Sequence, residues 1–443
     1  MEFGWVALVI ICVIVYAVVC WEIKKRNFHP EIFAFMGPCL MVRTSRTGIF
    51  DVLARFRRTF LVYGTLGVVV VAACSVLMTV MIIVTAYLTM LIQPDPSPII
   101  QPQNLLLIPG VNDFVPSTFA VWFALVFAVV IHEFGHGLLS RVEKIRVKYT
   151  GILALVIPIG AFVEPDEEEI EKSPLATKLR MFAAGITNNL VVGAICILAL
   201  ILLLGMIVPG TVPFVQGVYE GYPADLAGMQ PGTVILAIDG VPVANTTDIS
   251  TLLAGTIPGQ TIQVLGEYKG VQQMYDITLT SVPPDITGSS AGNTTSGFMG
   301  VLYGDPQAIT DTLHAWTHPE TLGDVLVSAL NFLVLPFSSL AGSSSFGMLV
   351  TDTPDPAFLS APFDGFWEII HVLYWCAWVN ILLGTFNALP IGPLDGGQML
   401  REGVKSFLAK RGKEEYALPL CSVITNLLIV VIIIPIIMPY FFR

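Results

Sequence analysis

The chain has 443 residues, of which 54% are hydrophobic and only 12% are charged. Soluble domains carry roughly 25% charged residues, so the composition indicates a membrane protein with several spans. The formal net charge of −11 argues against a nucleic-acid partner, because proteins that bind nucleic acids present basic surfaces.

A helix needs about 20 apolar residues to cross a bilayer. We therefore predict a polytopic α-helical membrane protein with about six transmembrane helices. The first run is followed by Lys24, Lys25 and Arg26, which favours a transmembrane helix over a cleaved leader. The six apolar runs are 3–21, 60–93, 118–140, 181–208, 366–389 and 417–440.

Basic residues are unevenly distributed between these runs. They collect at 22–59, 141–180 and 401–413, whereas 94–117 has none and 209–365 has only Lys269. Cytoplasmic loops are enriched in Lys and Arg, so six spans place the three basic segments in the cytoplasm and 209–365 outside. A seventh span in the weaker apolar stretch 325–340 would put 401–413 on the wrong side, so we prefer six.

Residues 149–163 are apolar but too short for an upright span, and they contain Pro158 and Gly160. We predict a re-entrant extended segment. Non-helical backbone persists at membrane depth only where it lines a protein cavity, so this segment is a candidate wall of an active site. A loop packed at the membrane surface is the alternative.

Short strand-like runs separated by Gly, Pro and Asp indicate a small inserted domain at 213–284. The runs are Val234–Ile238, Thr261–Leu265 and Tyr275–Leu279. We predict N-terminal helices with a basic loop at 1–117 and a membrane core in two parts, at 118–208 and 366–400. The inserted domain covers 213–284, and a connector with an interfacial helix covers 285–365. A C-terminal loop and helix cover 401–443.

The motif His132-Glu133-Phe134-Gly135-His136 lies near the end of an apolar run. Residues four apart share one face of a helix, so both imidazoles can reach one metal ion. Glu133 is then placed to take a proton from a metal-activated water. Ionisable residues inside a span cost a few kcal/mol each, which favours a compensating cation over a structural polar cluster.

A catalytic zinc site usually has three protein ligands, and the third must come from elsewhere in the chain. Asp395 is the best candidate, because it follows an apolar span in a stretch broken by Pro390, Pro393 and glycines, on the same side of the membrane as His136. His314 and His318 are also four apart, but we expect them to be ordinary loop histidines on the opposite side.

These motifs resemble the site-2 protease family of intramembrane zinc metalloproteases. The likeness is carried by the His132–His136 motif, by Gly185-Ile-Thr-Asn-Asn189, and by Asn387 to Gly396. It implies that His132, His136 and Asp395 bind one zinc ion and that Glu133 is the general base. It also implies that Asn189 and Asn387 position the substrate, although an asparagine in a span can instead link two helices.

Residues 217–283 resemble a PDZ domain, on the stretch from Ala224 to Gly240. Such domains bind extended chain termini by adding a strand to a sheet edge, which implies a peptide terminus as a partner. A spacer without a peptide ligand is the alternative.

The resemblance implies regulated intramembrane proteolysis of transmembrane protein substrates, with the active site toward the cytoplasm and the PDZ-like domain extracytoplasmic. Two other functions stay open at this point. The chain can be a zinc protease that cuts peptides at the membrane edge, or a non-catalytic adaptor whose PDZ-like domain binds exposed peptide termini.

Overall fold

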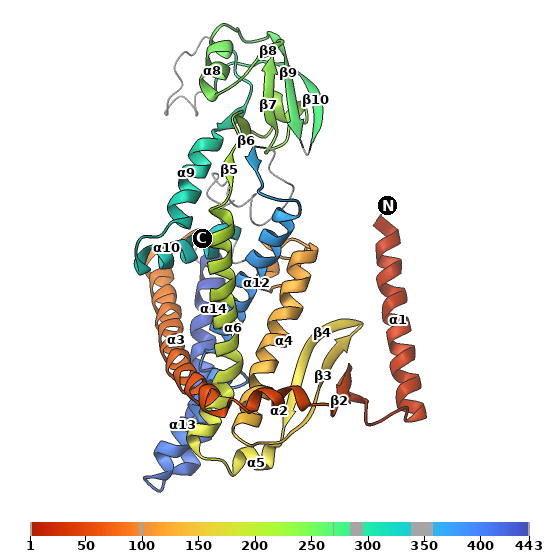
Figure 1. Cartoon of the computed structure of the whole chain (residues 1–443), viewed down its shortest axis with the longest axis vertical. Coiled ribbons are helices and arrows are strands. Elements are labelled where there is room, and N and C mark those ends of the chain that lie inside the picture. Colours follow the sequence, from red (N-terminus) through yellow and green to blue (C-terminus); the bar gives the residue numbers. More distant parts are fainter. Residues whose placement is uncertain are drawn as a thin grey trace. The chain divides into compact units, whose positions relative to one another are not determined.

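The computed structural model describes residues 2–96, 101–104, 106–268, 270–283, 296–337 and 358–441 (Figure 1). Five helices in this part of the chain are long and apolar enough to cross a membrane. The chain is therefore a multi-pass membrane protein, and five of the six predicted spans are found. They are α3 (Arg57–Ile92), α4 (Phe119–Val142), α6 (Leu175–Leu204), α12 (Phe366–Asn387) and Glu414–Phe441, which consists of the 3-10 helix η5 (Glu414–Tyr416) and α14 (Ala417–Phe441).

The remaining predicted span, 3–21, falls within the helix α1 (Glu2–Arg26), which has 25 residues and a basic last turn. The side chains of its first residues lie outside the described part. Tyr16 of α1 bonds to the start of the sheet, since its hydroxyl donates to the carbonyl of Pro38 at 2.8 Å and accepts from the amide of Leu40 at 3.1 Å.

An antiparallel sheet of four strands lies beside α4 in the order β1-β2-β3-β4 (Figure 1). The predicted extended segment 149–163 is a hairpin of β3 and β4, and β4 is an edge strand. The other two strands come from the basic loop at 22–59, where we had predicted no strands. The strands are β1 (Phe33–Met36), β2 (Cys39–Thr44), β3 (Val147–Leu155) and β4 (Ile157–Pro165), and the short helices around them are α2 (Gly48–Ala54) and α5 (Glu167–Glu171).

Two basic residues that we counted as loop charges lie inside α6 and are paired with acids. Lys178 Nζ is 2.9 Å from Glu402 Oε2, with side chains 10% and 11% exposed, and Arg180 pairs with Glu143. Glu402 belongs to α13 (Asp395–Ala409), so the first pair fastens α13 to α6. Removing one partner would leave a buried charge, which is strongly destabilising.

A second sheet forms the insertion between α6 and α12, with strand order β10-β9-β7-β6-β11 and β8 paired to β7. Its core buries Ile235, Ile249 and Ile262 completely. The three predicted strand runs correspond to β7, β9 and β10, but β11 lies beyond the predicted limit at 284. The strands are β6 (Phe214–Val218), β7 (Val234–Ile238), β8 (Val241–Pro242), β9 (Thr261–Tyr268), β10 (Val271–Thr278) and β11 (Val301–Gly304), with helices α7 (Pro223–Leu226) and α8 (Thr246–Ala254).

The predicted connector contains two helices, α9 (Pro306–Thr317) and α10 (Leu322–Val334), while residues 284–295 and 338–357 lie outside the described residues. Within the described residues α10 has 13 residues, fewer than the roughly 20 that a span needs, and the end of the stretch 325–340 lies outside them. The prediction that His314 and His318 lie in a loop was wrong. His314 is in the last turn of α9 and His318 caps it, and their rings stack with centroids 3.7 Å apart. The remaining short elements are η2 (Pro102–Asn104), β5 (Val208–Pro209) and β12 (Leu359–Ser360).

Candidate active site

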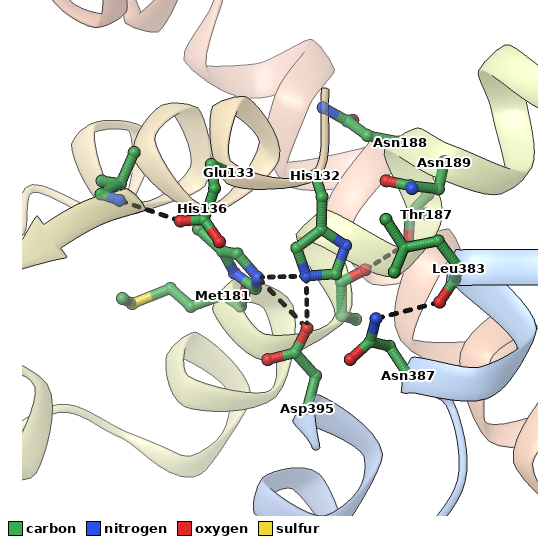
Figure 2. Close-up of polar contacts among 12 residues, drawn as sticks. His132, Glu133, His136, Met181, Thr187, Asn188, Asn189, Leu383, Asn387 and Asp395 are labelled. Carbon is green, nitrogen blue, oxygen red and sulfur yellow. Dashed lines mark hydrogen bonds and ion pairs between the residues drawn. The ribbon is translucent and has the colours of Figure 1, made fainter. Parts of the chain in front are cut away.

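The two histidines of the sequence motif lie one turn apart on α4 and face the same point, as Figure 2 shows. Their Nε2 atoms are 3.2 Å apart. His136 Nδ1 lies 2.8 Å from the carbonyl oxygen of Met181 on α6. A carbonyl can only accept, so Nδ1 carries the proton and Nε2 is left with a lone pair for a metal ion.

Asp395 is the first residue of α13, and it meets both imidazoles (Figure 2). Its Oδ2 lies 3.0 Å from His132 Nε2 and 3.2 Å from His136 Nε2. The two glycines that follow let the chain turn this tightly. A Cβ atom on Gly396 would lie 2.2 Å from the carbonyl oxygen of Ala388, so a side chain there would push Asp395 away.

The three side chains suit a metal ion. Their ligand atoms all lie within 4.8 Å of one another, and two nitrogens and a carboxylate oxygen are ligands that zinc binds. Two ligands of a tetrahedral zinc ion are about 3.3 Å apart, given bonds of about 2.0–2.1 Å. The observed separations of 3.0 to 3.2 Å are close to that value.

Gly185 on α6 leaves room for this group. A Cβ atom at this position would lie 2.6 Å from His136 Nε2 and 2.7 Å from His132 Nε2. Any side chain there would displace the imidazoles or occupy the space between the ligands. This contact gives a physical reason for the glycine that begins the Gly185–Asn189 motif.

The carboxylate of Glu133 points away from Asp395 and toward the hairpin (Figure 2). Its Oε2 accepts a hydrogen bond from the backbone amide of Val163 on β4 at 2.9 Å. The edge strand therefore fixes the orientation of the carboxylate, which sequence reasoning missed because the donor is a main-chain group.

The two asparagines lie near the three ligands but do not bond to them. Asn189 is fully buried, and its Nδ2 donates to the carbonyl of Ala128 at 3.3 Å, whereas its Oδ1 has no partner among the described residues. Asn387 donates to the carbonyl of Leu383 in its own helix at 3.0 Å. Asn188 has a different role, because it joins α3 to α4 through Tyr63 and Ile131.

The electrostatics of Asp395 favour its charged form. Burial acts to raise the pKa of this carboxyl, but when His136 and His132 are protonated their charge and hydrogen bonds outweigh it and hold that pKa below its ordinary value. An ionised carboxylate is the form that binds a metal ion.

The family model for peptidase family M50 matches residues 120–431, which is more than two thirds of the chain and contains all six predicted site residues. The chain belongs to peptidase family M50. Among its relatives is the zinc metalloprotease RasP of Shouchella clausii, 25% identical over 57% of this chain and 55% of the relative.

A second relative is the membrane-bound transcription factor site-2 protease homolog of Arabidopsis thaliana, 32% identical over 29% of this chain and 26% of the relative. The putative zinc metalloprotease Rip3 of Mycobacterium tuberculosis is 42% identical over 15% of each chain. The chain thus spans about half or less of the length of these relatives.

Proposed function

We propose that this M50 chain is a zinc metalloendopeptidase that cuts transmembrane helices of other proteins within the bilayer. The observation that carries the proposal is the convergence of His132, His136 and Asp395 on one point, with the Glu133 carboxylate held beside them. The three would hold one zinc ion, which, when bound, polarises a carbonyl and lowers the pKa of water.

The residues around the proposed zinc site each have a defined role in this proposal. Met181 fixes the tautomer and the orientation of His136. Glu133 accepts a proton from the attacking water and then delivers it to the leaving amine, because one carboxylate can serve both steps in turn. Val163 keeps that carboxylate in place during both transfers.

The substrate helix must unwind before it is cut, because its carbonyls are occupied by hydrogen bonds within the helix. The edge strand β4 offers an unwound segment a partner, since an extended chain can add to a sheet edge. The Val163 amide stays bonded to Glu133, so a segment paired with the neighbouring part of β4 would pass the catalytic carboxylate.

We assign Asn189 and Asn387 to the substrate, as groups that polarise or position its carbonyl. Replacing either by alanine is expected to lower kcat on the order of 10²-fold, as the loss of a carbonyl-stabilising donor does elsewhere. Zinc content should stay unchanged. The measurement is steady-state kinetics of the purified variants on a cleavable membrane substrate.

Asn188→Ala is the matched control, because this neighbour lies on α6 but bonds to Tyr63 and Ile131 instead. It should lower thermal stability and leave kcat close to that of the parent. If Asn189→Ala and Asn387→Ala turn over at the parental rate, both residues are helix-packing groups and the assigned role is wrong.

The topology we propose adds α1 as a sixth span, since it is as long as α14. The active site then lies toward the cytoplasm and the sheet of the insertion lies outside. We assign that sheet to a PDZ-like domain. Its edge strand β11 supports a peptide terminus as its ligand, because a free edge can pair with an added strand.

The proposal is tested with the purified full chain and a single transmembrane helix reconstituted together in lipid vesicles. We expect zinc-dependent cleavage at a position inside the apolar segment, mapped by mass spectrometry. The same helix sequence in soluble, unstructured form is the comparison. Cleavage of the soluble form alone would reject intramembrane proteolysis and favour a protease of membrane-edge peptides.

A further inference from the structure

A groove lies between one face of the four-stranded sheet and α4. Its volume is about 690 Å³, and Phe50 and Phe134 line it with their rings 5.4 Å apart. Val130 of α4 and Ile152 of β3 also line it and are 44% and 49% exposed, so apolar surface remains uncovered inside the groove.

The sheet side of the groove consists of two cross-strand rows. Val42, Ile152 and Ala161 are paired neighbours on β2, β3 and β4. Thr44, Thr150 and Val163 form the next row, two residues away along each strand. Alternate residues of a strand point to the same face, so all six side chains belong to the groove face.

The rows end at β4, where the groove meets the catalytic carboxylate. Glu133 lines the groove, and it accepts the amide hydrogen of Val163. Glu133 occupies the edge position beside Val163, so an additional strand paired to β4 would extend the Ala161 row by one position. Its side chain beside Ala161 would then lie on the groove face, next to Glu133.

We propose that this groove is a specificity subsite for one large apolar side chain of the substrate, at a residue adjacent to the peptide bond that is cut. The inference rests on the proposed function, because it requires a substrate strand at β4. The lining supports an apolar occupant, because Val42, Val130 and Ile152 are apolar and Glu133 is the only acid among the described residues that line the groove.

The test varies one substrate residue at a time around the mapped cleavage position, with Ala, Leu and Phe at each. At one position the parent enzyme is expected to prefer Phe or Leu over Ala by at least tenfold in kcat/KM, since a filled apolar pocket discriminates by about 10- to 200-fold per methylene. Ala161→Leu narrows the groove, and it should reduce that preference at least tenfold.

Leu153→Phe is the matched control, because Leu153 points to the opposite face of β3 and should leave the preference unchanged. Val42→Trp narrows the groove from β2 and provides a second test if Ala161→Leu does not bind zinc. A groove that holds a lipid chain instead would make both narrowing variants slower on all substrates alike, and that result would overturn the proposal.

The test of the subsite can be distinguished from the test of intramembrane cleavage. If the parent cuts only soluble peptides, the same Ala, Leu and Phe series is measured in a soluble peptide. A size preference that Ala161→Leu abolishes would then support the subsite while intramembrane cleavage is rejected. No size preference at any position would reject the subsite even if membrane helices are cut.

Discussion

Replacement of Glu133 by glutamine (E133Q) is expected to abolish peptide hydrolysis while zinc stays bound. The glutamine amide oxygen can still accept the hydrogen bond from Val163, so the hairpin keeps its place. The amide cannot take a proton from water, and loss of general-base catalysis costs roughly 10²- to 10⁴-fold in rate. The measurements are cleavage of the reconstituted helix and metal analysis of the same preparation.

Glu168→Gln is the control for this variant, because Glu168 is a surface carboxylate with its side chain 84% exposed and, among the described residues, an ion pair only with Lys172. It should cleave at the parental rate. Parental activity in E133Q would end the assignment of Glu133 as the base. Loss of zinc in E133Q would instead show that the carboxylate supports the metal ligands.

Asp395→Ala is expected to remove zinc and, with it, all measurable activity. The variant would keep two imidazoles and lose the anionic ligand. Losing a residue that only supports a metal ligand already lowers metal affinity about 10- to 100-fold, so losing a ligand itself should lower it further. A bound ion stabilises the folded state, so a chelator should lower the melting temperature of the parent. The same chelator should leave the melting temperature of Asp395→Ala unchanged.

Asp311→Ala is the control, because Asp311 lies on α9 and bonds only to Gln307 among the described residues. It should bind one zinc ion and respond to the chelator as the parent does. If Asp395→Ala keeps a full equivalent of zinc, Asp395 is not a ligand and a different third ligand must be sought.

The ligand cluster could be predicted because most of its geometry is local. Helical spacing alone brings His132 and His136 to one face, and proline and glycine before and after Asp395 end α12 and start α13. The topology of the apolar runs then brought the two segments together. In the structure Asp395 Oδ2 lies 3.0 Å and 3.2 Å from the two imidazoles, and zinc binding by the three residues stays a prediction.

Other features were beyond sequence reasoning because they depend on pairing between distant segments. The strands β1 and β2 lie more than one hundred residues before β3, and only their pairing reveals the groove face. Lys178 and Glu402 are separated by 224 positions, so the sequence alone predicts Lys178 to be a loop charge. The inserted sheet extends past residue 284, because β11 pairs with β6 from beyond that position.

The hydrogen bond between Val163 and Glu133 has a pharmacological consequence. In the proposed mechanism, a compound bound beneath β4 would tilt the strand and misalign the Glu133 carboxylate without touching His132, His136 or Asp395. Such an inhibitor would need no hydroxamate or other metal-chelating group, and added zinc would not change its potency.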